Sequence, residues 1–294
     1  MAGLTPTIGF EPQRPVLDLS GPKLRAAFET LANASERVGG LERFAEAVKL
    51  KAGAFHQRLG EGRAANLDRP DFEELVLLMA TVRRRIGPLF ERSGWPGLRA
   101  AINDLLEGAH DTATADRRIA RFESALCTPG GRLARGETPG PRQTRFLRDL
   151  AAEILHNVLP EHYPLMHRWV WDANTNTGAL REIWHGDNVD AMVIDVPDGY
   201  ETFLMLREEL SQFLAENGVF RDMLWHVDLL LAQVYATYIN AQGGAWLKTD
   251  FGSESDPLEH TLRIVGLDRV TGKPGKDKTL DGSADTLSDP KLLS

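Results

Sequence analysis

Cysteine is almost absent from this chain of 294 residues, in which Cys127 is the single thiol. One thiol excludes an internal disulfide and a zinc site built on cysteines. Disulfides accumulate in oxidising compartments, so their absence favours a reducing one and predicts a cytoplasmic protein.

Long hydrophobic runs are also missing. The most apolar stretch, residues 219–239, is interrupted by Arg221, Asp222, His226 and Asp228, and a bilayer span would not tolerate these groups near its centre. Residues 1–13 lack the basic and then apolar pattern of a signal peptide. We therefore expect no association with a membrane, and we interpret residues 219–241 as a buried core helix.

The sequence contains none of the common signatures of catalysis or cofactor binding. It has no GxGxxG or Walker A phosphate loop, no GxSxG nucleophile motif, and no HExxH or EF-hand metal spacing. These absences predict no cofactor and no metal, and they favour a protein that is not an enzyme.

Positive charge is scarce in the second half of the chain. Residues 1–145 carry 22 Lys and Arg against 18 Asp and Glu, whereas the remainder carries 12 against 24. Such asymmetry can place an acidic surface beside a part that binds a partner or nucleic acid. The surplus in the first half is far below that of a basic nucleic-acid-binding domain.

Breaks in composition divide the chain into five parts. Residues 128–143 form the clearest linker because they are rich in Pro and Gly. This divides the chain into an extended arm (1–21), a helical domain (22–127), the linker (128–143), a second domain (144–267) and a flexible tail (268–294). Within the helical domain we expect helices near 22–38, 41–51, 54–59, 72–85, 97–106 and 114–126.

The second domain is predicted to contain the β-structure. Residues 169–171 and 180–184 alternate like strands on either side of a turn-rich stretch, and residues 191–196 read as a third, more buried strand. Helices are expected at 144–159, 200–216, 219–241 and from 257 to about 265. The predicted class is therefore α+β and predominantly helical: an all-α domain, then a small antiparallel sheet packed on long helices.

Residues 41–59 suggest a DNA-reading pair of helices. Small and apolar residues flank a predicted break near residues 52–53, as a helix-turn-helix motif requires. The side chains that would face nucleic acid are His56, Gln57, Arg58 and Arg63. Lys49 replaces the usual turn glycine and acidic residues lie close by, and both features favour the alternative of two helices in an ordinary bundle.

Acidic and histidine side chains form a second candidate site. His185 and Asp187 lie beside the predicted strand 191–196, and Asp228 lies on an apolar side of the long helix. Such groups can act as general acids or bases, or bind a divalent cation. A buried carboxylate needs a partner, so Asp228 could equally belong to a structural pair or a subunit interface.

Three tryptophans within sixteen residues form a third candidate. Trp169, Trp171 and Trp184 fall on the predicted hairpin, flanked by Arg168 and Arg181. They would form either the core face of the sheet or an exposed platform that binds a partner.

Taken together, these features favour a non-catalytic accessory protein that works in a larger cytoplasmic complex, with a protein partner or as a homo-oligomer. One alternative is a DNA- or RNA-binding regulator that uses residues 41–59. A second alternative is an acid–base or metal-dependent enzyme that uses His185, Asp187 and Asp228.

Overall fold

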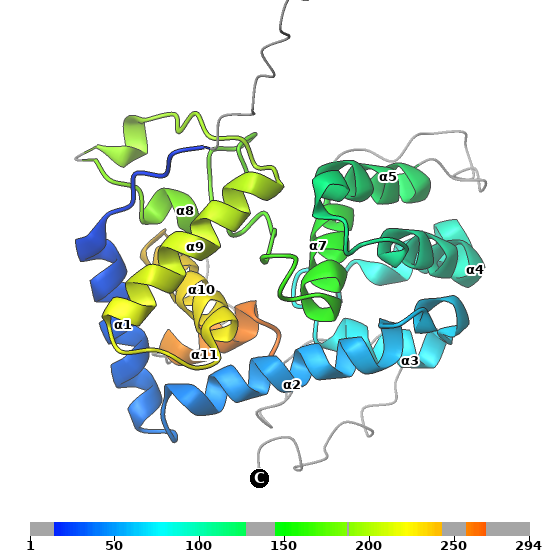
Figure 1. Ribbon diagram of the computed structural model, residues 1–294, viewed down its shortest axis with the longest axis horizontal. Coiled ribbons are helices and arrows are strands. Elements are labelled where there is room, and N and C mark those ends of the chain that lie inside the picture. The colour runs from blue at the N-terminus through cyan, green and yellow to red at the C-terminus, as the bar shows by residue number, and fades with distance from the viewer. Residues whose placement is uncertain (1–14, 128–144, 187, 243–256, 269–294) are drawn as a thin grey trace, which may run out of the picture.

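The computed structural model describes residues 15–127, 145–186, 188–242 and 257–268, and the regular secondary structure within them is helical (Figure 1). The α-helices are α1 (Gly21–Glu36), α2 (Leu41–Leu59), α3 (Arg69–Leu77), α4 (Ile86–Leu106), α5 (Ala115–Cys127), α7 (Phe146–Val158), α8 (Ala179–Glu182), α9 (Tyr200–Glu216), α10 (Met223–Gln242) and α11 (Pro257–Ile264). Three short 3₁₀ turns connect them: η1 (Arg63–Asn66), η2 (Thr112–Thr114) and η3 (Val189–Ala191).

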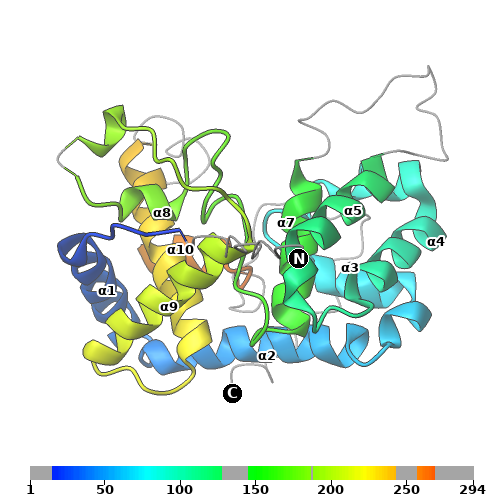
Figure 2. The same cartoon turned by 45° about the horizontal axis from the view of Figure 1, so that its top comes forward.

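The helices form two groups joined by α2. Helices α1, α8, α9 and α11 pack around α10, whereas α5 packs against both α4 and α7. Figures 1 and 2 both show α2 running beneath the two groups, and α2 contacts α7 as well as α10. Leu41, Phe44, Val48, Phe55 and Leu59 are buried along its length, which gives this helix an apolar face at both ends.

The predicted division into domains does not coincide with these groups. Helix α1 packs against α10, and α7 packs against α4 and α5. Helices from the two predicted domains therefore contact each other in both groups. Residues 128–143 lie outside the described residues, and a boundary there stays a prediction. Most of the predicted arm and tail, 1–14 and 269–294, lie outside them as well.

The predicted α+β class is wrong. The described residues contain no β-sheet, only two isolated bridges, Leu19 with Trp184 and Asp172 with Thr177. The predicted hairpin assumed that Trp169 and Trp171 face one way and Val170 the other. All three are buried, because the chain turns at this point and core surrounds it on every side. An alternating pattern cannot distinguish this arrangement from a strand with one wet face.

Three other predicted helix boundaries also differ. Helix α2 is continuous, so the predicted break near residues 52–53 is wrong. Gly53 costs about 1 kcal/mol in a helix interior, and burial of Ala52 and Phe55 beside it offsets that cost. The helix predicted at 72–85 ends at Leu77. Helix α4 begins eleven residues before the predicted start and continues through a kink at Gly94.

Gly178 is required by the turn that precedes α8. Its φ of +127° belongs to a backbone region that side-chain-bearing residues rarely adopt. A Cβ atom there would lie 2.6 Å from the carbonyl oxygen of Val170. The turn lets the amides of Ala179 and Leu180 donate to the carbonyls of Trp169 and Val170.

We predict that Gly178→Ala lowers the free energy of unfolding by about 2 kcal/mol or more, since backbone strain and a steric clash add together. Gly53→Ala is the matched control, because nothing lies within 4 Å of a Cβ at that exposed helical position. It should leave stability unchanged or raise it by up to about 1 kcal/mol. Urea unfolding followed by circular dichroism measures both, and equal stability of the two variants would contradict the role given to Gly178.

Candidate functional site

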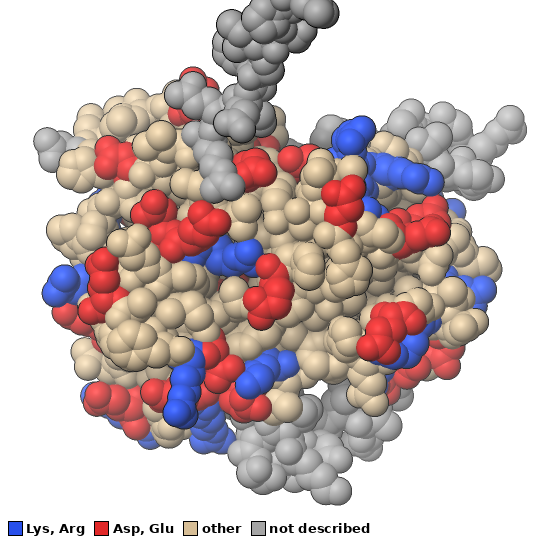
Figure 3. All heavy atoms as spheres, in the orientation of Figure 1, with Lys and Arg blue, Asp and Glu red and all other residues tan. Residues whose placement is uncertain are grey.

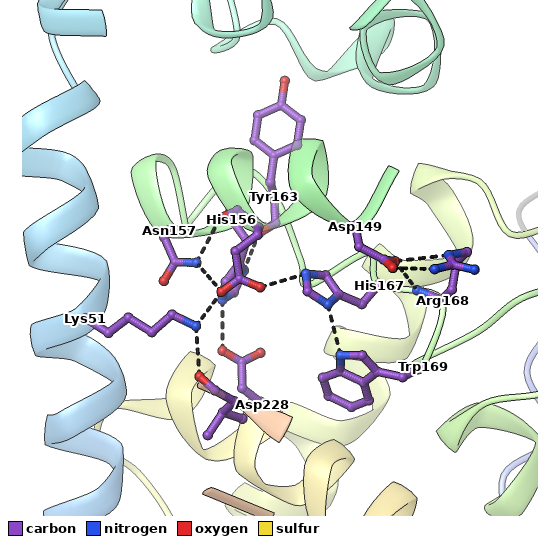
Figure 4. Close-up of polar contacts among 11 residues, drawn as sticks. Lys51, Asp149, His156, Asn157, Tyr163, His167, Arg168, Trp169 and Asp228 are labelled. Carbon is purple, nitrogen blue, oxygen red and sulfur yellow. Dashed lines mark hydrogen bonds and ion pairs between the residues drawn. The ribbon is translucent and has the colours of Figure 1, made fainter. Parts of the chain in front are cut away.

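The highest concentration of buried ionisable groups lies on α7. Asp149, Glu153, His156 and Asn157 are all buried, although the rest of the helix is largely apolar. Their spacing of four, three and one residues puts them on one side of the helix. That side would ordinarily face water, but here it faces α2, α10 and the chain after α7 (Figure 4). Each polar group therefore needs a partner from another element.

Lys51 of α2 supplies the partner of Glu153. Its ammonium group pairs with Glu153 Oε1 and donates a hydrogen bond to the carbonyl of Val265 at 2.8 Å. The two charged side chains are only 6% and 5% exposed. Burial by itself would raise the pKa of Glu153, but the charges of Lys51 and His167 and the hydrogen bonds to both outweigh it, and the pKa lies well below its usual value. Glu153 is therefore a buried carboxylate that stays ionised.

His167 lies on the other side of the same carboxylate. The indole N–H of Trp169 donates to His167 Nδ1 at 2.9 Å, so Nδ1 is an acceptor and the ring proton is on Nε2. Nε2 lies within ion-pair distance, 2.8 Å, of Glu153 Oε2. His167 is therefore held between Trp169 and Glu153.

His156 and Asp228 form a second buried pair, between α7 and α10. His156 Nδ1 lies 2.9 Å from the Tyr163 carbonyl, which can only accept, and Nε2 lies 2.8 Å from Asp228 Oδ2. Burial lowers the pKa of His156, but the charge of Asp228 and both hydrogen bonds outweigh it and raise the pKa above 6.5. With two acceptors, the ring is held as an imidazolium.

Arginine–aspartate pairs continue the network outward from α7. Asp149 accepts from Arg168 at 2.6 Å, which holds the chain that leads to the tryptophans. Arg145 donates to Asp172 at 3.0 Å. Arg148 pairs with Asp198 at 2.8 Å, just before α9 begins. The polar side of α7 thus connects to the irregular segment between α7 and α9 at three places.

Very little free space remains inside the cluster. The cavity that reaches Lys51, Glu153, His156 and Asp228 has a volume of about 10 Å³, which is the space of one water molecule. The amide oxygen of Asn157 lines this cavity without a partner among the described residues. Among the described residues, this cavity has no room for a molecule larger than water. No group of three or more metal-ligating residues occurs in the described part of the chain.

The structure does not bring the predicted acid–base residues together. Asp228 pairs with His156 rather than with His185. His185 is exposed, and its backbone N–H donates to the carbonyl of Asp18 at 2.8 Å. Asp187 lies outside the described residues. The expected site at the end of strand 191–196 also loses its premise, because no strand pairs there.

The predicted aromatic platform is part of the core. Trp169 and Trp171 are buried, and Trp184 is partly buried against the core. The flanking arginines are engaged: Arg168 binds Asp149, and Arg181 donates to two backbone carbonyls. A partner could not bind the two buried tryptophans at the surface.

The predicted nucleic-acid-binding residues lie at the end of α2, and most have partners within the protein. Arg58 pairs with Glu74 at 2.5 Å and with Asp71 at 3.5 Å. Arg63 pairs with Glu61 at 2.8 Å, and its guanidinium also donates to the carbonyl of His56.

His56 and Gln57 are exposed, and His56 Nδ1 lies 3.2 Å from the carbonyl of Val158. The turn that a helix-turn-helix motif needs is absent from α2. None of the described helices is long and apolar enough to cross a membrane.

In comparisons with known proteins, no protein-family model, curated protein or solved structure matches the chain.

We predict that Lys51→Met lowers the free energy of unfolding by about 3–5 kcal/mol, because it leaves Glu153 charged and unpaired in the core. The double variant Lys51→Met/Glu153→Leu should lose less than the single variant, since it leaves no unpaired charge at this position. Lys49→Met is the control on the same helix; its exposed ion pair with Asp222 should matter little. Denaturant unfolding at pH 7 measures all three. If the two substitutions changed the free energy of unfolding additively, the pairing of Lys51 with Glu153 would be contradicted.

We predict a separate pH dependence from His156. Because its pKa is raised in the folded state, its contribution is complete below pH 6.5 and is lost as pH rises through the folded value. Unfolding free energies of the native chain should therefore fall above neutral pH. In Asp228→Asn that fall should disappear, and the His156 ring protons should titrate at lower pH by NMR. An unchanged titration in the variant would refute the pair.

Proposed function

We propose that the chain is a non-catalytic accessory protein that binds another protein within a larger cytoplasmic assembly. The observation that carries this proposal is the closed polar cluster. Its acid, base and ammonium groups are paired with one another, and the adjoining cavity of about 10 Å³ has no room for a substrate. Groups arranged in this way hold helices together.

The surface offers additional support. Val193 is 83% exposed and Phe220 is 78% exposed, and both belong to connections on either side of α9. Single exposed apolar residues are common. Here the connection that carries Val193 is held by hydrogen bonds from Asn176 and Arg181, so an apolar side chain is presented in a fixed position. Fixed, exposed apolar groups are typical of surfaces that bind a partner.

Affinity purification of the tagged chain at its native level, with quantitative mass spectrometry, tests the proposal. We expect one partner in a constant molar ratio with the chain, retained through size-exclusion chromatography. Cells that carry the tag alone supply the background. A chain that elutes as a monomer without a stoichiometric partner would argue strongly against an accessory role.

A further inference from the structure

The connection between η3 and α9 contains an isolated strand-like segment, residues 192–196. It has neither helix nor turn, and Met192 has β-region angles of −92° and 143°. Ile194 and Val196 are buried, whereas Val193 and Asp195 are exposed. This alternation is the one expected of an extended strand with one face on the core. Figure 1 shows the connection crossing the molecule on its way to α9.

Side chains replace a neighbouring strand along one edge of this segment. The amide of Asn176 donates to the Met192 carbonyl at 2.8 Å and accepts from the Ile194 N–H at 3.1 Å. A residue of an adjacent parallel strand makes the same two bonds, through its own N–H and C=O, to residues i and i+2. The indole of Trp171 continues the row by donating to the Val196 carbonyl at 3.0 Å.

The opposite edge has no such partner. The N–H and C=O of one residue in a strand point to the same edge and those of the next residue to the opposite edge, so those of Val193 and Asp195 point away from Asn176. Among the described residues, neither of these two residues makes a backbone hydrogen bond along this edge. Two N–H and two carbonyl groups are therefore available in strand spacing, next to β-branched side chains. Such an edge is a template on which another strand can pair.

The charge around the edge indicates what would pair there. No Lys or Arg occurs between Arg181 and Arg207, whereas this interval contains six acidic residues: Glu182, Asp187, Asp190, Asp195, Asp198 and Glu201. Of these, Asp198 is already paired with Arg148. Figure 3 shows acidic and uncharged surface over the connection that leads to α9, with basic side chains gathered over α5 instead. A second copy of this chain would bring two acidic edges together, which is unfavourable.

We propose that residues 192–196 are a docking edge for an extended basic segment of a partner protein, which adds to the edge as a β-strand. The inference rests on the proposed accessory function and specifies the kind of partner. Backbone hydrogen bonds to Val193 and Asp195 hold the segment, and its Lys or Arg residues face the acidic surroundings. Pro197 limits the pairing to this short stretch, because proline has no N–H to donate.

The probe for this inference is a fluorescent, acetylated hexapeptide of alternating lysine and valine. Its matched control has the same sequence but carries N-methyl groups on alternate backbone nitrogens, which remove the donors and leave the charge. Fluorescence anisotropy at low salt should give saturable binding of the first peptide to the full chain. N-methylation should weaken binding about tenfold, since one or two hydrogen bonds are lost.

Two variants test the same edge from the protein side. Val193→Pro removes the outward N–H and should weaken binding about tenfold, whereas Val193→Thr keeps both the N–H and the β-branched shape and should bind within about twofold of the native chain. Circular dichroism checks that both are folded. Because the N-methylated peptide is tested on the native chain, the result does not depend on whether the proline variant folds.

Three outcomes of the peptide-binding and self-association measurements would overturn the inference. Equal binding of both peptides would mean attraction by charge without strand pairing. No binding of the unmethylated peptide at about 1 mM, far weaker than a specific interaction, would mean that the edge does not accept a strand. Self-association of the chain that Val193→Pro abolishes would identify a second copy as the occupant.

A native partner retained equally by the proline and threonine variants would leave the accessory function intact and reject this edge. Absence of any native partner, with peptide binding as expected, would reject only the accessory function.

Discussion

The buried pair of Lys51 and Glu153 is the constraint around which the other helices are arranged. An ammonium and a carboxylate can enter a core only as neighbours, because an unpaired charge there costs several kcal/mol. Their pairing fixes α2 against α7, and the bond from Lys51 to the Val265 carbonyl brings the residue after α11 to the same point. Since α2 also packs on α10, a single charged contact helps to set the positions of four helices.

The remaining polar groups of α7 extend this arrangement rather than add a separate site. His156 and Asp228 join α7 to α10, and Arg168 on Asp149 holds the turn that contains the buried tryptophans. Replacing a buried ion pair by apolar residues often leaves stability unchanged, so pairs of this kind are weak evidence for stability. They favour one arrangement over others, because a helix shifted along its axis would leave each charge unpaired.

Much of the helical framework could be predicted from the sequence, because apolar spacing and terminal signals are local. The helices predicted at residues 22–38, 200–216 and 219–241 correspond to α1, α9 and α10, although α10 begins only at Met223. The prediction of strands was wrong because Trp169, Val170 and Trp171 are buried on all sides, and an alternating sequence pattern does not reveal such burial. The polar cluster on α7 was not predicted, for a related reason. Asp149, Glu153 and His156 look like the wet side of α7, and only the tertiary positions of Lys51 and Asp228 show otherwise. The one local signal was Asp228 itself, whose need for a partner was predicted, although not the identity of His156.

The polar core and the proposed docking edge are physically connected. Asn176 occupies the edge of residues 192–196 that is opposite the proposed docking edge. It lies in the loop whose first residue, Asp172, is held by Arg145 beside α7. Trp171 donates to the Val196 carbonyl on the same edge as Asn176, and it is fully buried one residue before that loop. The edge is thus fixed by the same elements that hold the charges of α7. A strand that is already extended and held in place loses little conformational entropy when a partner adds to it, so the structure of the core supports binding at the surface.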